Sequence, residues 1–170
     1  GDILGYGIPA PTFPPAVTAP PASASRNPTI LNTESAPAFG RLVISADFEP
    51  HPRTVTITAG GPNQMNGSLG TECIGFIDAA QPDFELIYTP GPYDLFIYGE
   101  AASDIALLVR APDGSWHCND DGSNRGLDPT IRFRAPQSGS YKIWVAKVDP
   151  GQVDATLLVS ETDPDPARRR

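Results

Sequence analysis

The sequence predicts an all-β protein: an antiparallel β-sandwich or jelly roll preceded by an extended Pro-rich N-terminal arm. Two observations lead to this prediction. Of the 170 residues, 20 are Pro and 16 are Gly, and prolines scattered along a chain break helices. Short runs rich in β-branched and aromatic residues alternate with clusters of Gly, Pro, Asp and Asn, which is typical of strands joined by turns. No run shows the 3.6-residue period of a helix.

Residues 1–38 form the predicted arm. Eight prolines and only three charged residues lie within residues 1–40, and such a segment favours extended polyproline conformations without a core of its own. Two interpretations stay open, a disordered linker and an assembly element that lies on a partner or on its own domain. The second would use apolar anchors as partner-binding residues, namely Ile3, Leu4, Tyr6, Ile8 and Phe13.

Residues 39–161 form the predicted sandwich, and a polar tail follows at 162–170. Alternation is clearest near the end of the sandwich, where Tyr141, Ile143 and Val145 are separated by single residues. Side chains two apart on a strand point the same way, so we expect these three to share one face. The predicted strands are 42–48, 54–58, 73–78, 84–89, 93–98, 105–110, 130–134, 139–148 and 154–160.

Composition excludes several classes of function. The net charge is −8, with only two Lys and ten Arg, whereas a general nucleic-acid binder needs a basic face. No apolar run approaches the length of a transmembrane helix. The chain begins with Gly1 rather than Met and shows no signal peptide. We therefore expect a bacterial protein processed after export, in the periplasm or outside the cell, with a trimmed chain as the alternative.

Cys73 and Cys118 are the only cysteines, and two cysteines in an exported chain most often pair. The closed loop would hold roughly 45 residues, which the chain-entropy treatment converts to about 4 kcal/mol of stability. The rival is a metal–thiolate site that also uses His51 and His117. These four residues lack zinc-finger spacing, so we predict a disulfide.

An acidic turn is the strongest local signal for a ligand. Segment 113–122 places three neighbouring oxygen-bearing side chains in one turn, and Ca²⁺ accepts six to eight oxygen ligands at flexible geometry. The pattern lacks the register of an EF-hand. The alternative is that Asn and Asp are simply turn formers that bond local amides. The candidate Ca²⁺ ligands are Asp83, Asp104, Asp113, Asn119, Asp120 and Asp121.

A catalytic interpretation has little support. The motifs of nucleophile elbows, zinc proteases and phosphate-binding loops are absent. His117 and Cys118 are adjacent and could form a nucleophilic pair, but a disulfide would remove the thiol. Asp120 and Asp121 could form a glycosidase pair, although neighbours on one turn rarely straddle a substrate. Three aromatic residues could stack on a sugar or simply pack within the sandwich, namely Trp116, Tyr141 and Trp144. We predict no enzyme.

Seven stretches follow one another in an order that carries a family resemblance: 73–77, 82–84, 103–109, 111–116, 118–121, 128–129 and 138–145. They resemble the bacterial pre-peptidase C-terminal domain and its relatives, through an Asp before the strand with Leu107, a turn, and a Gly-x-Tyr strand that starts at Gly139. The resemblance covers about residues 39–161. It implies an exported, non-catalytic β-sandwich module, and some members bind calcium or collagen. Members take some calcium ligands from an acidic linker before the sandwich, and no such linker is found here.

Three functions follow from these observations. The first is a non-catalytic accessory or structural subunit, which binds a partner protein or larger assembly through its arm and sandwich surface. The second is a calcium-dependent module that binds carbohydrate or matrix through the turn at Asn119. The third is a small hydrolase built on the same acidic cluster, which would need two separated carboxylates in a buried cleft.

Overall fold

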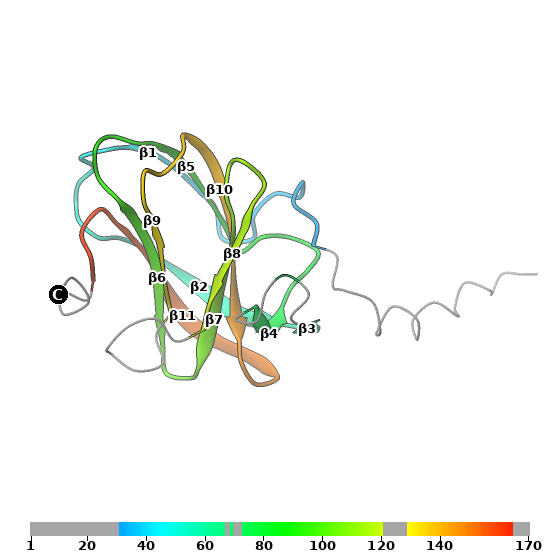
Figure 1. The fold of residues 1–170 in the computed structure, drawn as a ribbon. Helices are drawn as coiled ribbons and strands as arrows, with labels where there is room; N and C mark the ends of the chain where they lie inside the picture. Colours follow the sequence, from blue (N-terminus) through cyan, green and yellow to red (C-terminus); the bar gives the residue numbers. More distant parts are fainter. Residues whose placement is uncertain (1–30, 67–68, 70–72, 121–128, 165–170) are drawn as a thin grey trace, which may run out of the picture.

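A computed structural model describes residues 31–66, 69, 73–120 and 129–164. Within this part of the chain, 11 strands form two sheets packed face to face, and none of these residues is helical (Figure 1). No helix there could cross a membrane. The all-β sandwich is confirmed. The strands are β1 (Arg41–Ser45), β2 (Arg53–Gly61), β3 (Asn63–Asn66), β4 (Ile74–Ile77), β5 (Phe84–Thr89), β6 (Leu95–Ala101), β7 (Ile105–Arg110), β8 (Trp116–Asn119), β9 (Thr130–Phe133), β10 (Gly139–Lys147) and β11 (Gly151–Ser160).

Strand β10 is the centre of the seven-stranded sheet. It pairs antiparallel with β5 along one part of its length and with β7 along another, and it meets β4 at Lys147. Strands β3 and β8 extend the sheet beyond β4 and β7. Strand β1 runs parallel to β5, so the predicted antiparallel order fails at this one pair. The two strands are not joined by a hairpin, and no tight turn therefore forces them to be antiparallel.

The other sheet has four strands in the order β2-β11-β6-β9, all antiparallel. Strand β2 pairs with β11 from Arg53 to Gly61. Strands β1 and β2 are both edge strands, one in each sheet.

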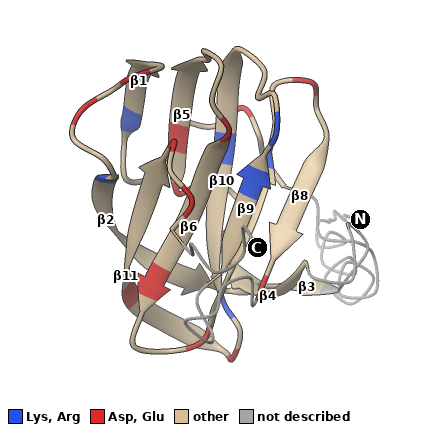
Figure 2. Cartoon of the chain, turned by 60° about the vertical axis from the view of Figure 1, so that its left-hand side comes forward, with Lys and Arg blue, Asp and Glu red and all other residues tan. Residues whose placement is uncertain are grey.

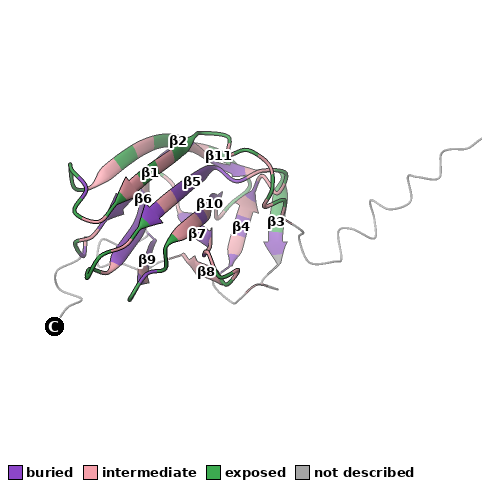
Figure 3. Cartoon of the chain, turned by 90° about the horizontal axis from the view of Figure 1, so that it is seen from above, coloured by how far each residue is buried: buried purple, intermediate pink, exposed green. Residues whose placement is uncertain are grey.

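The main core lies between the sheets, as the alternating sequence pattern predicts. Tyr141, Ile143 and Val145 are each at most 1% exposed. They share one hydrophobic cluster with Leu107 of β7 and Leu157 of β11. Figure 3 shows the buried residues concentrated in the central strands and exposed residues along β2 and the loops. The expected inward face of β10 is confirmed.

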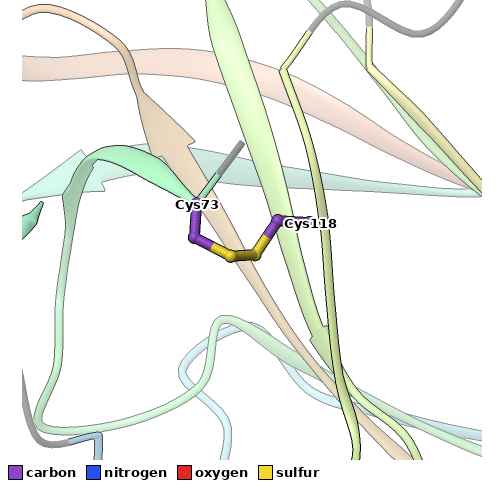
Figure 4. The surroundings of a disulfide bond; sticks show 2 residues. All are labelled: Cys73 and Cys118. Carbon is purple, nitrogen blue, oxygen red and sulfur yellow. A yellow bond between two sulfur atoms is a disulfide. The ribbon is translucent and has the colours of Figure 1, made fainter. Parts of the chain in front are cut away.

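A second, smaller core covers part of the outer face of the seven-stranded sheet. Ile77 of β4 is buried there with Leu108 of β7 and Trp144 of β10. The disulfide between Cys73 and Cys118, whose Cα atoms lie 5.1 Å apart, joins the residue before β4 to β8 (Figure 4). The predicted disulfide is confirmed, and it ties the β3–β4 hairpin to β8.

The chain before β1 lies against the sandwich from the start of the described residues. Leu31 packs against the second core. The N–H of Asn32 donates to the carbonyl of Ala79 at 2.8 Å, and the N–H of Ala38 donates to that of Pro82 at 2.9 Å. Residues 31–38 were assigned to the arm from composition, and their backbone is bonded to the sandwich.

Strands β3 and β8 were not predicted, because neither contains a run of β-branched and aromatic residues. β3 has the sequence Asn-Gln-Met-Asn, in which Met65 is the single apolar residue. β8 consists of Trp, His, Cys and Asn, all half-buried. Both strands lie at ends of the seven-stranded sheet, and an edge strand covered on part of one face needs no regular apolar alternation.

Candidate binding surface

A groove of about 350 Å³ opens on the outer face of the seven-stranded sheet. We call it the outer groove. Its walls come from β7, β10, the turn before β10 and the segment before β1. Because Tyr141 and Ile143 point into the core, the residues between and beside them point outward. The polar side chains of the groove are Thr33, Glu34, Arg110, Ser138, Ser140 and Lys142.

Arg110 is held in the outer groove by an aromatic side chain. The strand register places it beside Lys142 on one side and Trp116 on the other. Its guanidinium carbon lies 5.4 Å from the centre of the Trp116 ring, close enough for a cation–π interaction. Trp116 in turn packs on buried Trp144, with ring centres 5.6 Å apart. Arg110 pairs with no carboxylate of the described residues.

Glu85 lies next to the outer groove, and Arg41 and Lys142 balance the charge of its carboxylate. Arg41 Nε donates to Glu85 Oε1 at 2.6 Å, and Lys142 Nζ lies 3.6 Å from Oε2, which also accepts from Ser140. Figure 2 shows this red band on β5 between blue bands on β1 and β10. Burial by itself would raise the pKa of Glu85, but the hydrogen bonds from Ser140 and Arg41 and the charge of Lys142 lower it below its ordinary value. Glu85 is therefore a carboxylate that holds two cations in place.

Asp113, Ser115 and His117 form a polar row on the β7–β8 turn. The row contains the three residue types of a catalytic triad, but its serine lies between the aspartate and the histidine. Ser115 Oγ donates to Asp113 Oδ1 at 2.6 Å, and the same Oγ lies 2.9 Å from His117 Nε2. Since the serine proton already goes to Asp113, the imidazole must donate to Oγ. A base that donates to the nucleophile cannot remove its proton. The hydrogen bonds from Ser115 also hold the pKa of Asp113 below its ordinary value.

One predicted metal ligand, Asp83, bonds through its side chain to the backbone of β10, and a second, Asp104, bonds through its backbone carbonyl. Asp83 is 3% exposed, and its Oδ2 accepts the N–H of Val145 at 2.7 Å. Burial raises the pKa of Asp83 to about 7, which the bond from Val145 opposes and the charge of Asp78 reinforces. Asp104 lies between β6 and β7, where its carbonyl accepts the N–H of Val148 at 3.0 Å.

The remaining predicted ligands lie around β8. Asn119 Oδ1 accepts the N–H of Thr130 at 3.2 Å and so links β8 to β9, while Asp120 is half-buried just after β8. Asp121 lies outside the described residues. No group of three or more His, Cys, Asp or Glu side chains among the described residues is placed to hold a metal ion. The calcium site therefore stays a prediction.

The structure removes the predicted Cys118–His117 nucleophilic pair and two of the three aromatic residues that could have stacked on a sugar. Cys118 is bonded to Cys73, so no thiol is available beside His117. Tyr141 and Trp144 are both fully buried and serve packing rather than a sugar-binding surface. The predicted arm residues Ile3, Leu4, Tyr6, Ile8 and Phe13 lie outside the described part of the chain.

Sequence reasoning missed Arg110 and Lys142. They lie 32 positions apart (142 minus 110) and meet only because β7 and β10 pair in the register Lys142↔Arg110. Alternation along β10 indicates that Lys142 points away from the core. No sequence pattern indicates which strand lies beside it.

Comparisons with known proteins find similarity in solved structures alone. No protein-family model matches the chain, and no curated protein does. The pre-peptidase C-terminal domain of a collagenase from Bacillus anthracis is similar over 76% of this chain and 100% of that one, with 14% identity and a TM-score of 0.41. PliG of Aeromonas hydrophila, a periplasmic inhibitor of g-type lysozyme, is similar over 71% and 97%, with 16% identity and a TM-score of 0.39. A solved pre-peptidase C-terminal domain is thus among the structures similar to this chain, as the sequence resemblance predicted.

Proposed function

We propose that this chain is a non-catalytic accessory or structural subunit of an exported assembly, which binds a partner protein through the outer groove and its N-terminal arm. The disulfide supports export, because such bonds persist in oxidising compartments. The polar row on the β7–β8 turn supports a non-catalytic role, since its serine is not activated.

The observation that carries the proposal is Arg110, which stacks on Trp116 and pairs with no carboxylate of the described residues. Arg and Trp are enriched among the residues that dominate binding energy at protein interfaces. A planar guanidinium can bind a carboxylate through two parallel hydrogen bonds, and Lys142, which pairs with Glu85, lies beside it. The best-fitting partner is therefore an acidic segment of another protein.

A random peptide library selected against the full chain tests this surface. We expect the selected peptides to be rich in Asp and Glu. Their affinity should fall at least about tenfold for Arg110→Gln, as expected for a lost charge-assisted pair, and should weaken with salt. Arg134→Gln is the matched control. Arg134 is exposed and does not line the outer groove, so this substitution removes the same charge at a different place on the surface. Equal affinity for the parent chain and Arg110→Gln would exclude the outer groove.

Calcium-dependent binding of carbohydrate or matrix through Asn119, Asp120 and Asp121 is kept as a separate proposal. It rests on the composition of the turn, whose oxygen-bearing side chains suit a hard cation. Its check is whether Ca²⁺ raises the melting temperature and a chelator reverses the rise. The double variant Asp120→Ala/Asp121→Ala should lose this response, and a parent chain that shows no response would end the proposal.

A further inference from the structure

An apolar cleft of about 270 Å³ opens at the edge of the sandwich between β1 and β2. We call it the edge cleft. Its lining includes Phe39, Leu42 and Val55 from the two edges and Phe84 from the interior. Phe39, at 37% exposure, is one of the three large apolar residues exposed in the described part of the chain. An apolar cleft with an exposed aromatic side chain in its wall indicates an interaction site.

Among the strands of the described residues, none pairs with the side of β1 that faces away from β5. Gly40 C=O accepts the N–H of Glu85, and Ala46 N–H donates to the carbonyl of Thr89. The even-numbered positions of β1 therefore bond to β5. By alternation, the N–H and C=O groups of Arg41, Val43 and Ser45 point away from it. An unpaired edge of this kind is a template for adding a strand.

The chain itself contains a segment suited to that edge. Residues 4–8 read Leu-Gly-Tyr-Gly-Ile, a strict alternation in which Leu4, Tyr6 and Ile8 would share one face of a strand. The other face would present only glycine between them. Pro9 follows, and because Pro lacks an N–H it would end the ladder. The segment has five residues, as does β1.

Charge also matches the segment to the cleft. Asp2 is the only charged side chain before Arg26. Arg53 lies at the mouth of the edge cleft and pairs with no acidic group of the described residues. An added strand whose first residues lie beside the beginning of β1 would bring Asp2 toward this arginine.

The spacer favours a neighbouring molecule over the same one. Seven prolines lie within residues 9–30, which favours an extended polyproline spacer of about 70 Å at roughly 3.1 Å per residue. A domain of this size is only about 40 Å across. The spacer would carry residues 4–8 beyond its own sandwich.

We propose that the edge cleft receives residues 4–8 of a second copy of this chain, which add as a strand to the free edge of β1. This inference rests on the proposed function and names the partner of the arm. Leu4, Tyr6 and Ile8 would enter the cleft or cover its apolar rim. Copies joined in this way would form exchanged dimers or longer chains.

Analytical ultracentrifugation of the full chain over a range of micromolar concentrations tests the proposal. We expect association that rises with concentration and is inhibited by a synthetic peptide of residues 1–10. The triple variant Leu4→Ser/Tyr6→Ser/Ile8→Ser should be monomeric and fully folded, since the described sandwich contains none of these residues. Val43→Pro should also be monomeric, because it removes only an outward N–H.

Two results would overturn the inference. One is a full chain that stays monomeric at every concentration, including the case in which its own arm binds back. The other is a triple-serine variant that associates as strongly as the parent chain. Arg110→Gln is expected to associate normally, so a failure of the outer groove and a failure of the edge cleft are distinguishable.

Discussion

The carboxylate of Asp83, a predicted Ca²⁺ ligand, bonds to the backbone of β10. Strand β10 pairs with β5 as far as Ile143 and with β4 at Lys147. Val145 lies in the gap, and the carboxylate of Asp83 accepts its N–H at 2.7 Å. A buried backbone donor without a partner would be costly. Asp83 therefore takes the place of a missing strand partner, while its burial makes its charged form unfavourable.

The stability of the protein should depend on pH through Asp83. Burial raises its pKa from 3.8 to about 7. Between these values the native state keeps a proton that the unfolded chain releases, so the free energy of unfolding falls as the pH rises through this window. The loss is on the order of 4 kcal/mol by pH 8. Asp83→Asn keeps the acceptor oxygen without the charge, and chemical denaturation at each pH should show that this fall disappears.

Asp149→Asn is the control for this effect, because Asp149 is exposed. Its pH profile should match that of the parent chain. Parallel profiles for Asp83→Asn and the parent chain would contradict the assignment to Asp83.

At the scale of elements, strands rich in β-branched and aromatic residues were predictable. The runs at β5, β7, β10 and β11 were located to within a few residues, because each is a short apolar run bounded by turn residues. Strands β3 and β8 were missed, because their burial comes from the hairpin, the disulfide and neighbouring residues rather than from a regular apolar pattern. The parallel pairing of β1 with β5 also could not be predicted from the sequence, since no tight turn joins the two strands.

Gly75 in β4 is required for the close approach of β4 to β10. It has a φ of +101°, and a Cβ placed there would lie 2.8 Å from the carbonyl oxygen of Lys147. Gly151 has a similar φ of +110° with nothing within 4 Å of such a Cβ. We expect Gly151→Ala to destabilise by about 1 kcal/mol through backbone strain alone, and Gly75→Ala by about 2–3 kcal/mol because the contact adds to the strain. Urea denaturation measures both, and equal losses would show that the contact is unimportant.

At the scale of the whole molecule, the disulfide joins parts of the chain that are 45 residues apart. Restricting the unfolded chain in this way contributes about 2–4 kcal/mol. Reduction of the parent chain should therefore lower its denaturation midpoint, and Cys73→Ala/Cys118→Ala should have the lower midpoint with or without reductant. A parent midpoint that reductant leaves unchanged would contradict this contribution of the disulfide to stability.

The sequence by itself determined what depends on neighbours along the chain. Alternation identified the inward face of Tyr141 and Ile143, and the cysteine count predicted the disulfide. The tertiary structure alone decided which strands lie side by side. Arg110 reaches Lys142, and β1 faces β2 across the edge cleft, because packing of the inner faces selects the strand order and register. Local patterns specify which way a side chain points, whereas only long-range packing specifies what it meets.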